Sequence, residues 1–270
     1  MDNKKHKKKL NFIVINHLKL SLIEYKSMSI ISEIKNKKLG LVEILVLGHE
    51  IYLKNIKLHL TLFCALIIPS SLPIIFLINY TITQNFNLIL ILVYFLYICF
   101  YLLVFGSIYS MSVAAATENF LLKKETRFKT LMSRIFADIG TLVNLNFRLS
   151  IAFILRLFLL VVPGIIYLVN NGYCIYAFVL RGQKGKAAFK YSRTIVKGNW
   201  WRVFLFLLLV LFSGFGLQRI LNQVLNTIPF INSISVLFLS ILISEFILIG
   251  TSIGSVLLFL NLDYNKSLEK

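Results

Sequence analysis

Three charged residues lie within the apolar segments of the sequence and are the first candidates for a chemical role. Glu245 is midway along the last long apolar segment, Arg156 is within the third expected span, and Arg219 is near the end of the fifth. A charged side chain inside a bilayer is costly, so each is a functional candidate by default. Arg156 and Glu245 are expected at similar depths, which allows the two side chains to meet. We favour a buried ion pair or a protonated, hydrogen-bonded Glu245 that fixes helix register over a polar path for a solute or proton.

No motif of a known catalytic or cofactor chemistry is present. His49 and Glu50 begin a zinc-protease pattern, but Leu53 stands where the second histidine would be. The hydrolase serine pattern, the Walker lysine loop and the dinucleotide glycine pattern do not occur, and the acidic residues are too scattered for a paired-carboxylate or metal site. The three cysteines lie in apolar stretches without metal-ligand spacing. We therefore expect no enzyme, no metal and no cofactor.

The elements that position these residues are expected to be membrane-spanning helices. Apolar residues make up 58% of the 270 residues and charged residues 15%, against about 45–50% and about 25% in an ordinary soluble domain. No Lys, Arg, Asp or Glu occurs over residues 58–117, a length that exceeds one span. The sequence therefore predicts an all-α polytopic membrane protein with about six transmembrane helices and amphipathic interfacial helices.

The pattern of charged and apolar segments predicts three parts. Residues 1–38 form a basic cytoplasmic extension, 39–263 a six-span membrane domain, and 264–270 a short cytoplasmic tail. The expected spans are 60–80, 88–114, two short spans or a broken hairpin within 149–180, 203–222 and 234–262. Interfacial helices are expected near 39–57, 115–145 and 186–198.

Prolines predict two local distortions. Pro69 and Pro73 lie within the first expected span and should distort it, with Ser70 and Ser71 available to bond freed carbonyl groups. The pair 163–164 (PG) is expected to break the segment 149–180. That break lets the chain leave the cytoplasmic side and return to it.

The basic residues predict the orientation. All of the 29 Lys and Arg residues except Arg156 and Arg219 fall in the segments 1–59, 115–148, 181–202 and 263–270. Positively charged segments face the cytoplasm, so both termini are expected there. Membrane orientation thus explains the net charge of +18, and we expect no nucleic-acid partner.

The segment between the fourth and fifth expected spans is the most distinctive cytoplasmic stretch. A helix from Lys186 would bury an apolar stripe and leave its basic residues polar, and two tryptophans follow where a span begins. We favour a topogenic loop and interface anchor over a docking site for anionic lipid headgroups, which the same residues would also suit. The residues concerned are Lys186, Lys190, Arg193, Lys197, Trp200 and Trp201.

A second spacing concerns helix packing. Gly250 and Gly254 form a G-x-x-x-G pattern in the last apolar segment, which permits close approach of another backbone. In a chain with six spans the partner is expected to be another helix of the same chain, and the alternative is a dimer face.

Three short segments suggest a family. Residues 163–167 (PGIIY), 185–193 (GKAAFKYSR) and 197–201 (KGNWW) resemble the membrane domain of bacterial glycerophosphoryl diester phosphodiesterases and related stand-alone integral membrane proteins of unknown function. The resemblance implies a six-span helical domain in a bacterial cytoplasmic membrane. It does not imply catalysis, because in those enzymes the phosphodiesterase chemistry belongs to a separate soluble domain, which the 270 residues do not contain.

These observations predict a non-enzymatic integral membrane protein that organises or assists a partner or a lipid process at the cytoplasmic face. The alternative is a transporter of a small solute or a lipid. The expected partners are the lipid bilayer, anionic lipid headgroups and a membrane or cytoplasmic protein.

Overall fold

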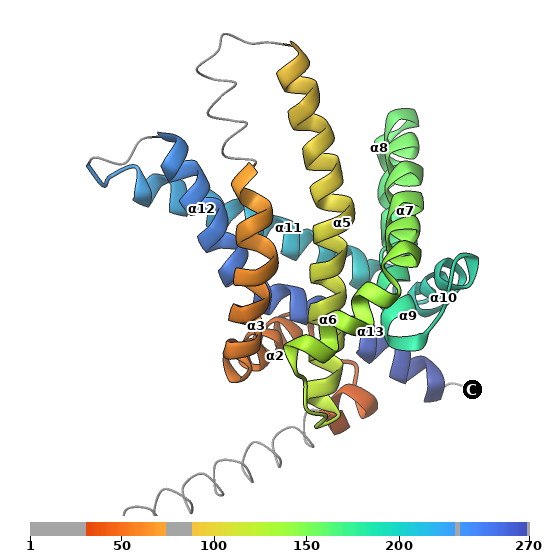
Figure 1. Ribbon diagram of the computed structural model, residues 1–270. Helices are drawn as coiled ribbons and strands as arrows, with labels where there is room; N and C mark the ends of the chain where they lie inside the picture. The colour runs from red at the N-terminus through yellow and green to blue at the C-terminus, as the bar shows by residue number, and fades with distance from the viewer. Residues whose placement is uncertain (1–30, 74–87, 230–232, 269–270) are drawn as a thin grey trace, which may run out of the picture.

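The computed structural model describes residues 31–73, 88–229 and 233–268, and all regular structure in these ranges is helical (Figure 1). The helices are α2 (Leu41–Lys54), α3 (Ile56–Leu62), the π-helical turn η1 (Phe63–Ile67), α5 (Leu88–Leu121), α6 (Phe128–Ala137), α7 (Ile139–Leu159), α8 (Val161–Asn171), α9 (Cys174–Arg181), α10 (Lys186–Val196), α11 (Trp200–Leu225), α12 (Ser233–Ile247) and α13 (Ile249–Leu268). The predicted all-α fold is confirmed.

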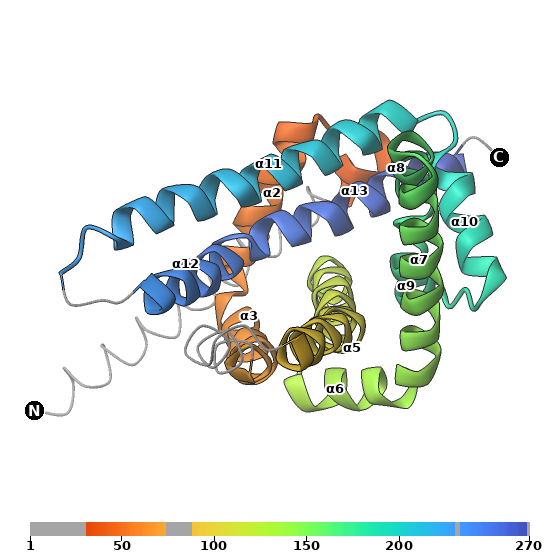
Figure 2. The ribbon, with the colours of Figure 1, turned by 90° about the horizontal axis from the view of Figure 1, so that it is seen from above.

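Six helical segments among the described residues are long and apolar enough to cross a membrane, which is the predicted number. They are Ile56–Pro73, Ile91–Leu121, Ile139–Leu159, Val161–Arg181, Trp200–Leu225 and Ser235–Ser267. The expectation of two short spans within 149–180 is wrong, because the third segment begins at Ile139 and the third and fourth each have 21 residues. The six segments do not form a parallel bundle. Seen from above, α3 and α5 are viewed nearly end-on, whereas α11, α12 and α13 run across the view (Figure 2).

The core is built around a close crossing of α2 and α13. Gly48 of α2 lies directly on the G-x-x-x-G pair of α13, and a Cβ atom added to Gly48 would be only 2.7 Å from the backbone nitrogen of Gly254 and nearer still to the carbonyl oxygen of Gly250. Ile44 and Ile51 on the same face of α2 are fully buried. Gly250 and Gly254 therefore pack within the chain.

The first candidate span contains the predicted distortion. In η1 the backbone N–H of Ile68 bonds the carbonyl oxygen of Phe63, five residues earlier, which widens the helix just before Pro69. Ser70 donates to the carbonyl oxygen of Ile67 at 3.1 Å, and Ser71 donates to that of Ile68 at 2.8 Å. The serine hydroxyls thus bond carbonyl groups beside the distortion, but not those of Ala65 and Pro69, which the two prolines were expected to free.

The predicted break at residues 163–164 is wrong by three residues. The chain reverses at Leu160, whose backbone is extended, and α7 and α8 form a helical hairpin. Pro163 is the third residue of α8, in a first turn whose N–H groups have no partner within the helix, so it breaks nothing. Gly164 allows α8 to pack closely against α7, because a Cβ atom at this position would lie 3.2 Å from the Cα atom of Leu157.

Other predicted boundaries also change. The single interfacial helix expected at 115–145 is wrong, because α5 continues to Leu121, α6 is short, and α7 begins at Ile139. The predicted tail from residue 264 is the last turn of α13 as far as Leu268. The helix expected at 39–57 is α2 and the start of α3, divided at Asn55. The expected linker 81–87 and most of the extension 1–38 lie outside the described residues.

Candidate functional site

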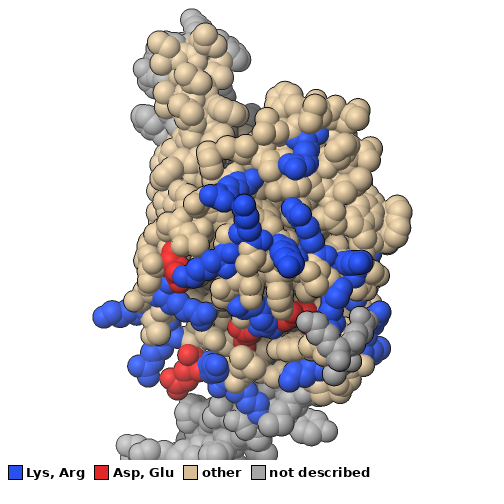
Figure 3. Space-filling view, turned by 90° about the vertical axis from the view of Figure 1, so that its right-hand side faces the viewer, with Lys and Arg blue, Asp and Glu red and all other residues tan. Residues whose placement is uncertain are grey.

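A basic groove of about 1140 Å³ lies between α7, α8 and α10, with the last turn of α13 at one end. Within the ranges that the structure describes, its lining includes seven basic side chains and no acidic one. Figure 3 shows basic side chains gathered on this face of the molecule. The seven are Arg148, Arg156, Lys186, Lys190, Arg193, Lys197 and Lys266.

Three glycines let the chain present α10 as one wall of this basic groove. Gly182 ends α9 with φ of 66°, Gly185 precedes α10 with φ of 55°, and Gly198 turns the chain into α11 with φ of 88°. Residues with a side chain rarely adopt these conformations. Between these turns, Ala188 and Ile195 are buried, which leaves the lysines of α10 on its outer side, as the sequence pattern predicts.

Polar contacts hold α10 against the end of α8. Ser192 donates a hydrogen bond to the carbonyl oxygen of Asn170 at 2.9 Å. The Nε atom of Arg193 donates to the side-chain oxygen of Asn171 at 2.8 Å, and the amide of Asn171 donates to the carbonyl oxygen of Tyr167 at 2.8 Å. Asn171 is therefore a structural bridge to the groove.

The opposite wall is a stripe of α7. Arg148, Ala152 and Arg156 are spaced by four residues and so share one face of the helix. Arg156 donates from Nη1 to the carbonyl oxygen of Ala152 at 2.7 Å, and its guanidinium carbon lies 4.1 Å from the centre of the Tyr167 ring. Aromatic stacking and the backbone contact fix this guanidinium at the groove wall.

The lysines of the groove are available to a ligand. Lys186, Lys190 and Lys197 are exposed, and within the described ranges none of the seven basic side chains forms a salt bridge. Lys266 donates to the carbonyl oxygens of Thr194 and Lys197 and closes one end. Like charges gathered without counter-charges repel one another, so an anion in the groove would relieve that repulsion.

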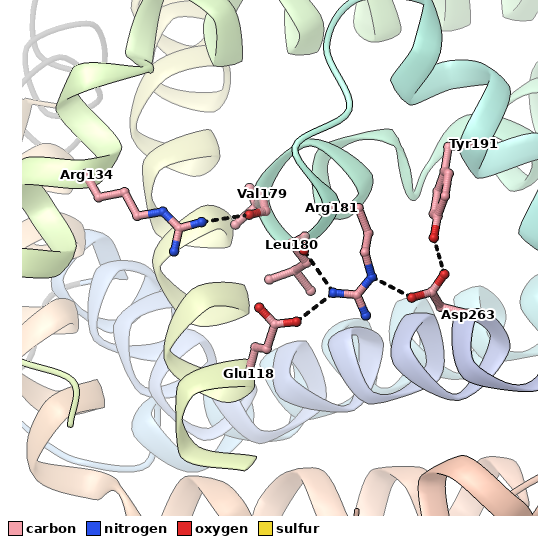
Figure 4. Close-up of polar contacts among 7 residues, drawn as sticks. All are labelled: Glu118, Arg134, Val179, Leu180, Arg181, Tyr191 and Asp263. Atoms are coloured by element: carbon pink, nitrogen blue, oxygen red, sulfur yellow. Dashed lines mark hydrogen bonds and ion pairs between the residues drawn. The ribbon is translucent and has the colours of Figure 1, made fainter. Parts of the chain in front are cut away.

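A separate ion network ties α10 to the rest of the molecule (Figure 4). Arg181 of α9 donates to Glu118 of α5 at 2.7 Å and to Asp263 of α13 at 2.6 Å. The hydroxyl of Tyr191 on α10 donates to the other oxygen of Asp263. Burial and this hydrogen bond raise the pKa of Tyr191 to about 12, so the hydroxyl stays protonated and able to donate at neutral pH. Arg134 of α6 donates nearby to the carbonyl oxygen of Val179 at 3.2 Å.

The expected pairing of Arg156 with Glu245 is wrong. Arg156 faces the basic groove, whereas Glu245 lies on α12 and is exposed. Within the described part of the chain no salt bridge joins the two. In Figure 2, α7 and α12 stand on opposite sides of the molecule.

The remaining predicted residues lie elsewhere. Arg219 is exposed and lines a separate pocket with Asn222 and Gln223 of α11. Trp200 stacks on Phe204 with ring centres 5.2 Å apart, and Trp201 is 69% exposed. Neither tryptophan lines the basic groove.

Seven of the twelve residues that line the basic groove were missed from the sequence, and three of them contribute a basic side chain or hold one in place. Arg148 was assigned only to the basic segment 115–148, Tyr167 to an apolar span and Lys266 to a tail. The spacing of eight residues from Arg148 to Arg156 was a usable signal, because it places both on one helix face. No spacing could place Lys266, which comes from α13, more than sixty residues after α10.

Comparison with known proteins gives no match. No protein-family model, no curated protein and no solved structure matches the chain. The chemistry of the basic groove is therefore inferred from its own residues.

Proposed function

We propose that this protein is a non-enzymatic integral membrane protein that binds the phosphate groups of anionic lipids in the basic groove and thereby organises or assists a lipid process at the cytoplasmic face. The observation that supports this most directly is the lining of the groove, which among the described residues has seven basic side chains and no acidic one. The groove adjoins α7, which is one candidate membrane span, and α8, which forms another together with α9.

The side chains suit a phosphodiester. Each Lys or Arg near an anionic membrane surface contributes about 1 kcal/mol of attraction. Arginine adds directed donors that match phosphate oxygens. Among the described residues, hydrogen bonds occupy only Nη1 of Arg156 and only Nε of Arg193. The other N–H groups of both guanidiniums therefore remain for a ligand.

We also propose that the groove opens toward the cytoplasm and that both chain termini lie on that side of a bacterial inner membrane. The excess of basic residues in the segments around α10 supports this orientation. The three segments that resemble the phosphodiesterase membrane domain all contribute lining residues, namely Tyr167, Lys186, Phe189, Lys190, Arg193, Lys197 and Gly198. A relationship to that family would therefore concern lipid contact by the membrane domain.

The test removes the charges of three lysine side chains that make no contact needed for the fold. In the triple variant Lys186→Gln, Lys190→Gln, Lys197→Gln, we expect affinity for phosphatidylglycerol to fall about 100-fold, which corresponds to about 1 kcal/mol for each lysine. Affinity for phosphatidylcholine should not change. Native mass spectrometry of the full chain in mild detergent, titrated with each lipid, measures both.

A matched triple variant controls for net charge. Lys57, Lys124 and Lys129 are exposed and lie outside the basic groove, so changing these three to Gln should leave phosphatidylglycerol binding within about twofold of the wild type. Equal losses in the two triple variants, or no loss in the first, would overturn the proposal.

A further inference from the structure

The basic groove is longer than one phosphate group needs. Its volume of about 1140 Å³ exceeds the roughly 300–1,000 Å³ of a pocket for one drug-sized ligand. Along the α10 wall, basic side chains recur at spacings of three or four residues, so they share one face of that helix. The first is Lys186 and the last is Lys197, which are about 16 Å apart along the helix axis. A single phosphate therefore engages only part of this wall.

The two arginines of the α7 wall are held apart. The Nε atom of Arg148 donates to the side-chain oxygen of Asn144 at 2.9 Å, and Nη1 of Arg156 donates to the carbonyl oxygen of Ala152 at 2.7 Å. Each guanidinium is thus bonded to the residue four positions earlier, so the two remain about two helical turns, or about 12 Å, apart. Hydrogen bonds from arginine to a phosphate oxygen are about 2.7–2.9 Å long. One phosphate group cannot bond both guanidiniums in these positions.

Each of these arginines keeps donors for a phosphate. A guanidinium has about five N–H groups, and among the described residues only one of them is occupied in Arg148 and one in Arg156. Neighbouring N–H groups of one guanidinium bond two phosphate oxygens together. The α7 wall therefore offers two separate anion positions, one at Arg148 and one at Arg156.

Two anion positions in one groove match a headgroup with two phosphates. Basic pockets between membrane helices on the cytoplasmic side suit headgroups of this kind. When a short bridge joins the two phosphates, binding of the first brings the second to its position at a high effective concentration. Two separate lipids with one phosphate each lack this advantage, because each loses its own freedom of movement on binding.

We propose that the basic groove selects lipids whose headgroup carries two phosphates, with one phosphate at Arg148 and the other at Arg156. This selectivity rests on the proposed function, since it requires that the groove binds lipid phosphates. It adds a preference among anionic lipids that follows from the distance between the two arginines.

The test compares two lipids that have the same four acyl chains. Tetraoleoyl cardiolipin has two phosphates joined by a glycerol, whereas tetraoleoyl bis(diacylglycero)phosphate has one phosphate. Each lipid is titrated against the full chain in mild detergent, and native mass spectrometry measures the bound fraction. We expect cardiolipin to bind about 100-fold more tightly, which is the lower end of the gain expected from joining two contacts.

The variant Arg148→Gln removes one of the two anion positions. It should lower the affinity for cardiolipin by at least about 10-fold. Affinity for the single-phosphate lipid should change by at most about twofold, because that lipid keeps the position at Arg156. Arg148 is exposed, so we expect the variant to fold, and circular dichroism checks this.

Arg127→Gln is the matched control. Arg127 is exposed and lies outside the groove lining, so its replacement removes the same charge without removing an anion position. Both affinities should stay within about twofold of the wild type.

The possible failures are distinguishable. Equal affinities of the wild type for the two lipids would overturn the selectivity and leave the proposed function intact. A preference for cardiolipin that Arg148→Gln does not reduce, or that Arg127→Gln reduces equally, would overturn the position at Arg148. If neither lipid binds and phosphatidylglycerol does not bind either, the proposed function is overturned, and the selectivity with it.

Discussion

At the scale of single residues, the position of a charge along a helix predicts its depth but not its direction. Arg156 and Glu245 are similar in expected depth, yet α7 and α12 stand apart, Arg156 lines the basic groove and Glu245 is exposed. Direction is set by which face each helix buries, and that depends on packing between segments far apart in the sequence. Arg156 is therefore better understood through Tyr167 and Ala152, which hold its guanidinium at the groove.

A prediction at this scale concerns the crossing of α2 and α13. In Gly48→Ala the new methyl group would meet the backbone of Gly250 and Gly254, and backbone atoms cannot rotate away as a side chain can. We expect a loss of about 3 kcal/mol in stability from this overpacking. Thermal unfolding in detergent, followed by circular dichroism, measures it.

Gly216 supplies the control for that substitution. A Cβ atom added there meets nothing within 4 Å, and Gly216 lies within the helix α11. Gly216→Ala should therefore be neutral or raise stability by about 0.5–1 kcal/mol. Equal unfolding temperatures for Gly48→Ala and the wild type would contradict the close crossing.

At the scale of elements, amphipathic pattern predicted α10 well, because its apolar stripe and its basic stripe both follow the helical period. Its function as a groove wall was not predictable, since the opposite wall comes from α7 and α8. The ends of helices were predicted less well where the prediction relied on charged residues. The charged residues of 115–145 suggested one surface helix, but they belong to the end of α5, to α6 and to the start of α7.

The network around Arg181 gives a prediction for the elements it joins. Arg181→Ala would leave the carboxylates of Glu118 and Asp263 without their shared cation, although both are mostly buried. Removing one partner of a buried ion pair lowers the free energy of unfolding by about 3–5 kcal/mol. We expect a loss at the lower end of that range, because the side chain of Arg181 is 22% exposed. Chemical unfolding of purified protein measures the loss.

The matched arginine is Arg127. Its ion pair with Glu125 is 3.5 Å long, and both side chains are more than 80% exposed. Arg127→Ala should therefore change stability by at most about 1 kcal/mol. Similar losses for the two Arg→Ala variants would show that the Arg181 network stabilises nothing.

At the scale of the whole molecule, composition was sufficient to predict a helical membrane protein, and the orientation that the basic residues indicate stays a prediction. Neither composition nor charge could predict that α3 and α5 run across the direction of α11 and α13. Hydropathy measures how apolar a segment is, and it contains no information about the angle at which two segments cross. That angle depends on contacts such as those of Gly48, which pair residues about two hundred positions apart.

The hairpin of α7 and α8 gives a prediction about depth in the membrane. Its tip is apolar and strongly exposed, with Phe158 at 86% and Leu160 at 68%. Such a tip is stable in hydrocarbon and unfavourable in water. In a variant without native cysteines, we expect Leu160→Cys to resist a membrane-impermeant thiol reagent from both sides of the membrane.

Two exposed positions control for access of the reagent. Under the proposed orientation, Thr227→Cys between α11 and α12 should react from outside intact cells, and Lys190→Cys should react only after the membrane is opened. Reaction of Leu160→Cys from outside would show that the hairpin crosses the bilayer completely.

The close crossing of α2 and α13 also has a consequence for the time course of synthesis. The ribosome makes α2 early, but the backbone surface that receives Gly48 belongs to residues 250–254, near the end of the described chain. Every intermediate helix is therefore inserted while α2 still lacks its partner. Domains of this kind complete their core only when the last segment arrives, so a nascent chain released before residue 249 presents an unpaired α2 to the quality-control proteases of the cell.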